Sequence, residues 1–285
     1  MTTPADLKTK CDPNWCPGCG NLAIWAAFKS ACVEKDWNSL NSVMVAGIGC
    51  HGHIINFTKM TSFEGLHGRA IPVATGIKLA NHLLNVFVFT GDGDCLGEGG
   101  NHYLHAARRN HDIKVFLHDN ALYALTTGQT SPATPHGSIT KSTPQGNPDY
   151  PLNPLTLALA AGATFVARAY AGDINYVKEM MIKATDHKGF AVVDILQPCT
   201  TFNKMMTHEF LQTNTYHLGP DHDASNKQAA FLKIGEFGEK SIPLGVFYQE
   251  EKPSYESQLP QLKQMPLIAH KIVRDNVKEL FKQYI

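Results

Sequence analysis

The sequence predicts an α/β fold built on a mainly parallel sheet with helices on both faces. Between about residues 20 and 200, segments with helical periodicity alternate five times with short, apolar, β-branched runs. The run Val86-Phe87-Val88-Phe89 is continuously apolar, as expected for a strand that is buried on both faces of a sheet. The chain of 285 residues is long enough to enclose a sizeable core around such a sheet.

The individual elements follow from the helical spacing of apolar residues and from short apolar runs typical of strands. A helix over 21–34 begins after the turn-like segment Gly18-Cys19-Gly20 and repeats its apolar residues at helical spacing. Apolar runs that end at a glycine predict strands over 42–46 and 86–89. The same patterns predict helices over 70–84, 97–109, 154–161 and 174–185, and strands over 114–117, 164–169 and 190–196.

Two long segments break the alternation. Residues 126–149 are rich in Thr, Ser, Pro and Gly, and a loop of this length is usually functional. Residues 198–262 also look irregular, and 266–284 have the pattern of a closing helix. We therefore expect an α/β domain over 1–200. A C-terminal arm and helix over 201–285 is expected to pack on a partner subunit.

Composition and charge exclude several classes of protein. The 25 basic and 25 acidic residues balance, whereas a nucleic-acid-binding protein usually has a basic excess. No apolar stretch is long enough to span a bilayer, and the first residues lack the pattern of a signal peptide, so a cytoplasmic protein is expected. Seven cysteines are too few for a disulfide scaffold, and in a reducing compartment clustered cysteines are more often ligands or redox groups.

Four of the cysteines lie on predicted turns or strand ends. Cys16 and Cys19 enclose a Pro-Gly turn, and this C-x-x-C spacing fits structural zinc, a thioredoxin-like pair or half of an iron–sulfur site. Cys50 lies on the glycine-rich turn after the first predicted strand, and Cys199 follows the last one. Cys11 is the main rival of Cys16 as a ligand.

A second constellation joins two neighbouring strand ends. Asp92 follows the strand over 86–89, and Asn120 follows the next strand, with one predicted helix between them. The carboxyl ends of parallel strands meet at one edge of the sheet, so the two side chains should lie close together. Their carboxylate and amide oxygens suit Mg²⁺, and the adjacent Gly91 and Gly93 leave backbone N–H groups free for a diphosphate.

These motifs together carry a family resemblance. The Gly-Asp-Gly and Asn pattern resembles the diphosphate-binding half of thiamine-diphosphate enzymes. With Cys16-Pro17-Gly18-Cys19, Gly47-Ile48-Gly49-Cys50 and Gln197-Pro198-Cys199 added, the chain resembles the β subunit of 2-oxoacid:ferredoxin oxidoreductases over about residues 13–255. The segments around Trp15 and His67 look closer to the 2-oxoglutarate branch than to the pyruvate branch.

The resemblance implies specific site residues. It implies that Cys16, Cys19, Cys50 and Cys199 bind one 4Fe–4S cluster. It also implies that thiamine diphosphate is bound with Mg²⁺ held by Asp92, Asn120 and the backbone carbonyl of Leu122. His67 is the best candidate for a catalytic contact with thiamine or substrate. The implied thiamine contacts are Ile48, Gly49, Cys50, His51, His67, Gly93, Asp94, Ala124, Leu125 and Thr126.

The implied reaction is the CoA-dependent oxidative decarboxylation of a 2-oxoacid, or its reverse, with electrons passed to ferredoxin. Thiamine enzymes also need a carboxylate from a second domain, and this chain has room for only one such domain. An α subunit is therefore implied, in an αβ or α2β2 heteromer. Thr127 stands where many relatives have Lys or Gly, which leaves the choice of 2-oxoacid open between 2-oxoglutarate and pyruvate.

Two other classes of function remain as alternatives. A non-redox thiamine-dependent decarboxylase subunit would use Asp92 and Asn120 but would have no role for four converging cysteines. A zinc or thiol module would use Cys16 and Cys19 but would leave the spacing of Asp92 and Asn120 as coincidence.

Overall fold

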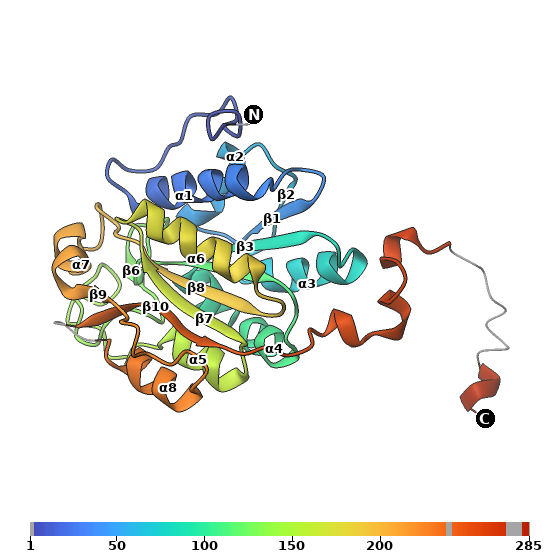
Figure 1. Ribbon diagram of the computed structural model, residues 1–285. Coiled ribbons are helices and arrows are strands. Elements are labelled where there is room, and N and C mark those ends of the chain that lie inside the picture. The colour runs from blue at the N-terminus through green and yellow to red at the C-terminus, as the bar shows by residue number, and fades with distance from the viewer. Residues whose placement is uncertain (1–2, 238–240, 272–280, 285) are drawn as a thin grey trace.

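A computed structural model describes residues 3–237, 241–271 and 281–284 (Figure 1). Its centre is an eight-stranded sheet in the order β2-β1-β3-β4-β8-β7-β10-β9, which is parallel except where β10 pairs with β7. The predicted mainly parallel α/β fold is thereby confirmed. The strands are β1 (Ser42–Ala46), β2 (Ser62–Glu64), β3 (Asn85–Gly91), β4 (Lys114–Asp119), β7 (Phe165–Tyr170), β8 (Ala191–Leu196), β9 (Thr215–His217) and β10 (Ile242–Gln249).

Helices cover both faces of this sheet (Figure 1). One face carries α1 (Gly20–Lys35) and α6 (Ile174–Asp186), and the other carries α3 (Ala70–Ala80), α4 (Gly100–Arg109), α5 (Pro154–Ala161) and α8 (Lys227–Gly235). Alternate residues of one strand enter opposite cores, because strand side chains alternate between the faces. Phe87 and Phe89 of β3 face α1, whereas Val86 and Val88 face α3 and α4.

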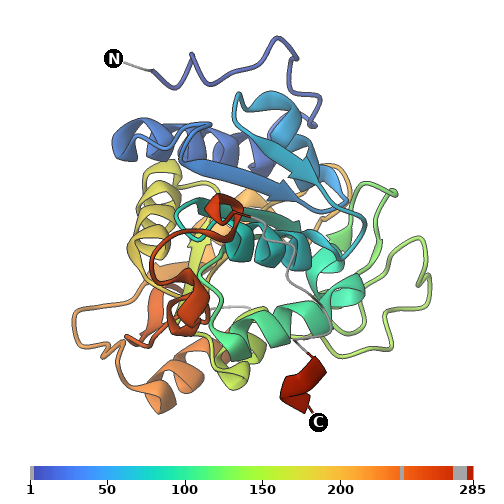
Figure 2. The same cartoon turned by 90° about the vertical axis from the view of Figure 1, so that its right-hand side faces the viewer.

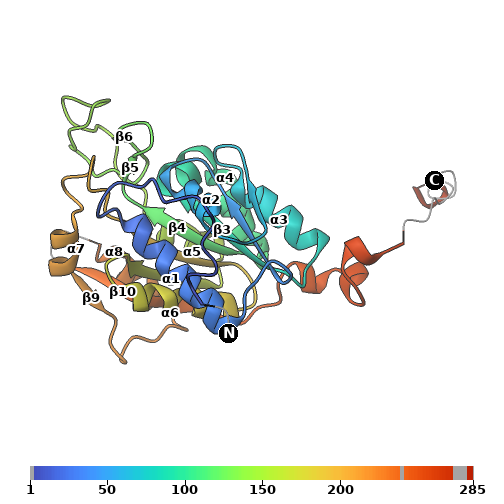
Figure 3. The ribbon, with the colours of Figure 1, turned by 90° about the horizontal axis from the view of Figure 1, so that it is seen from above.

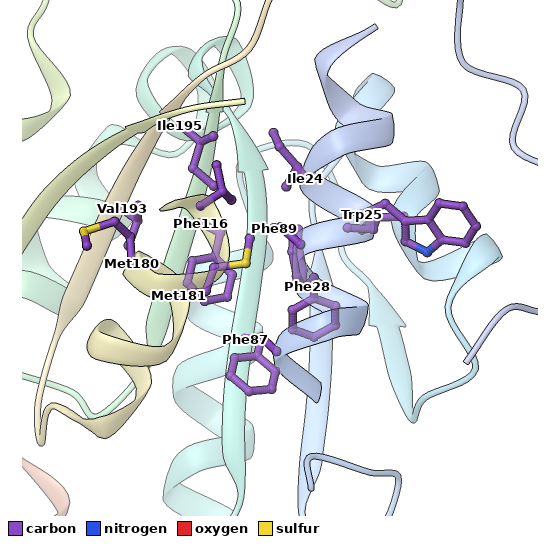
Figure 4. Packing of buried hydrophobic residues seen from close by; sticks show 14 of the residues in the cluster. Ile24, Trp25, Phe28, Phe87, Phe89, Phe116, Met180, Met181, Val193 and Ile195 are labelled. Atoms are coloured by element: carbon purple, nitrogen blue, oxygen red, sulfur yellow. The ribbon is translucent and has the colours of Figure 1, made fainter. Parts of the chain in front are cut away.

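Aromatic side chains fill the core on the α1 side (Figure 4). The ring of Phe28 on α1 meets Phe87 and Phe89 edge-on, with ring centroids 5.2 and 4.9 Å apart. Each such edge-to-face pair contributes about 0.5–1.5 kcal/mol beyond the area that it buries. Met180 and Met181 of α6 close the same core. This packing fixes α1 against the sheet, and with it the cysteine turn that precedes the helix.

The predicted helix and strand boundaries shift at a few places. The helix predicted over 70–84 ends at Ala80, because Asn81 has extended backbone angles. The helix predicted from residue 97 begins at Gly100 and is preceded by a wide π-helical turn over Gly93–Glu98. The strands over 86–89 and 114–117 continue to Gly91 and Asp119, which brings their ends to the predicted magnesium residues.

The segment after residue 198 is more regular than the sequence suggests. It forms α7 (His208–Asn214), β9, α8 and β10, so much of the expected irregular arm belongs to the body of the fold. β10 pairs with β7 and contains Gly245 at a positive φ and a register shift between Val246 and Tyr248, which hide its two-residue period. The domain division at residue 200 and the packing of residues 201–285 on a partner remain predictions.

The chain leaves the sheet after Gln249. Residues 250–271 contain short 3-10 turns, and Figure 2 shows them in front of the amino ends of the strands. Of the segment 266–284, for which a helix is predicted, the described residues form the 3-10 turns Leu267–Ala269 and Lys282–Tyr284, and Phe281 is helical. Residues 272–280 of that prediction lie outside the described residues. In the described part of the chain, no helix is both long and apolar enough to cross a membrane.

Candidate active site at the carboxyl edge of the sheet

The sequence motifs come together at the carboxyl ends of the parallel strands. The turn of Cys50 follows β1, Asp92 follows β3, Asn120 follows β4, and Cys199 follows β8. Figure 3 shows the loops of the small hairpin β5 (Leu122–Tyr123) and β6 (Gln129–Thr130) at this edge, opposite the departing C-terminal segment. In open α/β sheets this edge is where ligands bind.

The four cysteines singled out from the sequence line one pocket of about 190 Å³. Cys16 and Cys19 reach it from the turn before α1, Cys50 from the turn after β1, and Cys199 from the end of β8. Cys19 and Cys199 are buried, whereas Cys16 is exposed. Cys11, the rival of Cys16, is exposed and does not line this pocket. The other lining residues are Asn14, Trp15, Asn21, His53, Asn120, Ala124, Leu125, Gln197, Thr200 and Phe202.

The thiols are close enough to influence one another. Burial raises the pKa of Cys50 to about 12, and the neighbouring Cys19, Cys199 and Cys16 act in the same direction. Burial likewise raises the pKa of Cys19 to about 11, with Cys199 and Cys16 adding to the effect. Such thiols are poor nucleophiles at neutral pH, but a positively charged metal centre bound among them would favour their thiolate forms.

Hydrogen bonds hold the cysteine turns in place. The indole N–H of Trp15 donates to the carbonyl of Cys50 at 2.6 Å, and its ring packs edge-on against Phe57. Thr200 Oγ1 donates to the carbonyl of Pro17 at 3.0 Å, and His208 Nε2 lies 2.8 Å from the carbonyl of Gly18. The Cys-Pro-Gly-Cys turn is therefore tied both to the segment after β8 and to α7.

Asp92 and Asn120 lie side by side, as predicted from their strand ends. The backbone N–H of Asn120 donates to Asp92 Oδ1 at 3.4 Å, and Ser131 Oγ donates to Asp92 Oδ2. Asn120 Oδ1 accepts from the N–H of Leu122 at 3.0 Å, which places Asn120 and Leu122 in one tight turn beside Asp92. Burial raises the pKa of Asp92 to about 7. A bound divalent cation would favour the carboxylate form, so this donor set fits Mg²⁺.

The buried carboxylate of Asp94 holds the neighbouring turns in place through hydrogen bonds. Its carboxylate accepts hydrogen bonds from the N–H of Gly68 at 2.7 Å, the N–H of Ile48 at 3.2 Å and Thr90 Oγ1 at 2.7 Å. A Cβ at Gly47 would lie 1.7 Å from Asp94 Oδ2, so only glycine fits there. Burial alone would raise the pKa of Asp94, but the His51 imidazole and these donors together hold it below its usual value. A direct contact of Asp94 with the cofactor remains a prediction.

Two predicted contact histidines adjoin Asp94. His67 Nδ1 lies 2.9 Å from Asp94 Oδ1, and its side chain is 38% exposed, so it can reach a ligand. His51 is buried, with Nε2 3.6 Å from Asp94 Oδ2. Within the described residues, His51 Nε2, His118 Nε2 and Asn21 Nδ2 are buried without a hydrogen-bond partner. Unpaired buried polar atoms are rare in proteins, and their gathering at this edge fits a site that binds a polar group.

The turn of Ala124, Leu125 and Thr126 lies on the cysteine side of the site. Ala124 and Leu125 line the cysteine pocket, and Thr126 Oγ1 donates to Gln129 Oε1 at 2.6 Å. No sequence pattern pointed to Tyr123, whose ring covers the glycine-rich turn so closely that a Cβ at Gly93 would lie 2.5 Å from it. Ser131 was missed as well, because it lies in the long loop whose sequence shows no periodic pattern.

Comparisons with known proteins agree with this geometry. The family described as "Thiamine pyrophosphate enzyme, C-terminal TPP binding domain" matches residues 47–195. The family of C-terminal regions of the pyruvate ferredoxin oxidoreductase beta chain matches residues 199–264. A 2-oxoacid:ferredoxin oxidoreductase subunit beta from Sulfolobus sp is 46% identical over 260 residues, covering 86% of this chain and 85% of that protein.

Two further relatives carry a more specific name. The 2-oxoglutarate synthase subunit KorB of Archaeoglobus fulgidus is 41% identical over 207 residues, covering 72% of this chain and 77% of its own length. A solved structure of 2-oxoglutarate:ferredoxin oxidoreductase from Magnetococcus marinus, with 2-oxoglutarate, coenzyme A and succinyl-CoA bound, aligns with a TM-score of 0.91 at 35% identity. The alignment covers 99% of this chain and 96% of the solved one. This chain belongs to the family of 2-oxoacid:ferredoxin oxidoreductase β subunits, which are subunits of oxidoreductases with a thiamine-diphosphate-binding domain.

Proposed function

We propose that this β subunit, together with an α subunit, catalyses the CoA-dependent oxidative decarboxylation of 2-oxoglutarate, or the reverse reaction, with ferredoxin as the electron partner. Membership of a β-subunit family implies an α partner and a heteromer. The choice of 2-oxoglutarate is supported by the sequence around His67 and by relatives that are named for this substrate. Pyruvate is the alternative substrate that an activity assay must exclude.

One observation carries this proposal: the cysteine pocket and the predicted cation site share a wall. Asn120 lines the pocket together with Cys16, Cys19, Cys50 and Cys199, while its neighbour in space is Asp92. When bound, thiamine diphosphate supplies the chemistry that releases CO₂ from a 2-oxoacid, and a 4Fe–4S cluster supplies one-electron transfer. A shared wall brings the two groups close, as the transfer of electrons between them requires.

Different residues of this chain would then bind Mg²⁺, bind the diphosphate and position His67. We assign Asp92, Asn120 and the carbonyl of Leu122 to Mg²⁺, and the glycine-rich turns from Ile48 to His51 and at Gly93 to the diphosphate. Asp94 holds the first of these turns and also orients His67, whose exposed ring is placed to hold or move a proton near the substrate. Leu125 and Ala124 line the cysteine pocket together with Asn120.

The four thiols support a cluster rather than a single zinc ion. A tetrahedral zinc site needs its sulfurs about 2.3 Å from one atom. Among the described residues, no three His, Cys, Asp or Glu side chains are grouped tightly enough to hold one ion. Four cysteines that line one pocket without converging on a point suit a larger centre such as 4Fe–4S.

The deciding experiment is anaerobic purification of the co-expressed α–β complex, followed by quantitation of iron, sulfide, magnesium and thiamine. We expect iron and sulfide in the ratio of a 4Fe–4S cluster, one thiamine diphosphate per β chain, and ferredoxin reduction that requires 2-oxoglutarate and CoA. Thiamine without iron would indicate the non-redox decarboxylase, and zinc without thiamine would indicate the metal module. Faster turnover of pyruvate than of 2-oxoglutarate would contradict the proposed substrate.

A further inference from the structure

Gln197 connects the cysteine pocket to the predicted cation site through a single buried side chain. It follows β8, lines the pocket, and is 1% exposed. Its Nε2 donates to Cys19 Sγ at 3.4 Å and to the carbonyl of Pro198 at 2.7 Å. Its Oε1 accepts from Asn120 Nδ2 at 3.0 Å. Every polar atom of the amide therefore has a partner, and the two ends meet residues of two different sites.

The surrounding hydrogen bonds determine which end of the amide faces the sulfur. Asn120 Oδ1 accepts from the N–H of Leu122, so Asn120 Nδ2 must be the group that faces Gln197. An NH₂ group can only donate, and the Gln197 oxygen must therefore face Asn120. This leaves the NH₂ of Gln197 facing Cys19, where it forms an N–H···S hydrogen bond.

The backbone is shaped to hold Gln197 in this position. A Cβ at Gly20 would lie 2.9 Å from Gln197 Cγ, so the glycine after Cys19 makes room for the side chain. The N–H of Gly20 also donates to the carbonyl of Pro198 at 3.2 Å, and the N–H of Gln197 donates to the carbonyl of Asp119 at 2.7 Å. The start of α1, the end of β4 and the end of β8 are thus joined around one amide.

We propose that Gln197 is a positioning residue that couples the two sites by donating an N–H···S hydrogen bond to Cys19 and by orienting the Asn120 amide toward the cation. The inference rests on the proposed function, since it assumes that Cys19 binds a cluster and Asn120 binds Mg²⁺. The geometry of the bridge itself is independent of that assumption.

The physical consequence at the cluster has a definite sign. Reduction adds an electron, and a hydrogen bond to a ligating sulfur stabilises the added negative charge. The N–H of Gln197 therefore raises the reduction potential, and its loss makes the midpoint potential more negative. At the other end, the Asn120 side chain keeps only the contact of its amide oxygen with the N–H of Leu122, so its amide is held less firmly toward the cation. Loss of such an orienting contact weakens metal binding by about 10–100-fold.

The test is the Gln197→Met variant of the anaerobically purified α–β complex, because methionine keeps the length of the side chain and removes all three hydrogen bonds of the amide. An EPR-monitored redox titration should show a fully loaded cluster whose midpoint potential is more negative than that of the wild type. The dissociation constant of thiamine diphosphate at fixed Mg²⁺ should rise by about tenfold. A loaded cluster at the wild-type potential would overturn the N–H···S contact, and an unchanged dissociation constant would overturn the orienting role.

A matched control is Thr200→Val. This variant removes the hydrogen bond to the carbonyl of Pro17 in the cysteine turn, but the Thr200 hydroxyl donates to no sulfur. It measures how far loosening of the cysteine turn alone shifts the midpoint potential, and the shift should be smaller than that of Gln197→Met. If Thr200→Val shifts the potential as much as Gln197→Met, general loosening of the cysteine turn explains the effect and the proposal is wrong.

A measurement on the wild type keeps the inference testable even if Gln197→Met does not assemble. Pulsed EPR of the reduced cluster, with glutamine side-chain amides labelled with ¹⁵N, should show a nitrogen coupling from the glutamine amide. Absence of this coupling in a protein with a full cluster would overturn the inference while leaving the proposed function intact. A wild-type complex without iron would instead overturn the proposed function itself.

Discussion

Two buried polar clusters, one at each edge of the sheet, differ in how far their hydrogen bonds are satisfied. At the amino edge, Asp112 pairs with Lys114 at 2.6 Å and with Lys78 at 2.8 Å. The Lys114 ammonium also donates to the carbonyls of His187 and Gly189 at 2.6 and 3.0 Å, so all three of its protons have acceptors. At the carboxyl edge, by contrast, buried nitrogen atoms of Asn21, His51 and His118 have no hydrogen-bond partner within the described residues.

We infer from this difference that the network at the amino edge serves stability, whereas the group at the carboxyl edge serves ligand binding. A satisfied network contributes to folding and leaves nothing for a ligand, whereas unsatisfied buried groups cost stability unless something binds to them. The amino edge also anchors residues after β10, because Glu256 lies 2.6 Å from His111 and accepts the N–H of Asp112 at 3.1 Å. We therefore expect substitutions at the amino edge to lower stability, and substitutions at the carboxyl edge to remove cofactors while the fold survives.

The largest expected effect is at the carboxyl edge. Cys199→Ala removes one of four proposed cluster ligands, and the complex should lose its iron and its ferredoxin reduction completely. Iron and sulfide analysis, together with the EPR spectrum, measures this loss. Cys11→Ala is the matched control, since this exposed thiol lies outside the pocket and its removal should leave the iron content unchanged. A full cluster in Cys199→Ala would show that the four pocket cysteines are not one ligand set.

The next largest effect is at the amino edge. Asp112→Asn leaves the ammonium groups of Lys78 and Lys114 buried without a counter-charge, and breaking such a buried ion pair costs about 3–5 kcal/mol. Urea unfolding of the complex measures the loss, and activity per folded molecule should stay at the wild-type level. Glu179→Gln is the control: it breaks a half-exposed pair with Lys183 and should cost less than about 0.5 kcal/mol. Equal losses for the two variants would contradict the role of burial.

Asp92→Asn applies the same change to the other edge. Here the substitution removes a magnesium ligand, so the affinity for thiamine diphosphate should fall by at least about 100-fold. The free energy of unfolding without cofactor should stay within about 1 kcal/mol of the wild type, since asparagine can still accept the hydrogen bond from Ser131. Titration calorimetry and urea unfolding measure the two quantities. A loss of stability as large as that of Asp112→Asn would remove the contrast between the edges.

The same contrast explains what could be predicted from the sequence. Local pattern placed Asp92 and Asn120 at neighbouring strand ends and put Cys50 and Cys199 after predicted strands, whereas the grouping of all four cysteines was implied by the family resemblance. The contacts that organise the site join residues far apart in the chain, and no local pattern predicts them. Gln197 reaches Cys19 and Asn120, and Ser131 reaches Asp92, only after the strands have been arranged side by side.

The C-terminal region shows the second limit of prediction from sequence. The strand β10 was missed because Gly245 and the bulge after Val246 interrupt its alternation of apolar and polar residues. Pairing with β7 in the folded protein determines that strand, and the periodicity of its own sequence does not predict it. The amino-edge network was missed for a related reason, because Lys78, Asp112 and Lys114 look like ordinary surface charges until α3 and β4 are packed together.

The smallest expected effect is a pH dependence at the amino edge. Burial, with help from Lys114, lowers the pKa of His187 from its usual 6.5 to about 4, although Asp112 acts in the opposite direction. Between these values the unfolded chain binds a proton that the folded chain does not, so stability falls as the pH is lowered from about 6.5 toward 4. One such group contributes at most about 1.4 kcal/mol per pH unit. Urea unfolding at several pH values should give a shallower decline for His187→Gln than for the wild type. The His187 ring is hydrogen-bonded to Thr164 at 2.7 Å. Parallel declines would show that the network does not hold this ring neutral, and that its contacts at the amino edge restrain its protonation less than the structure indicates.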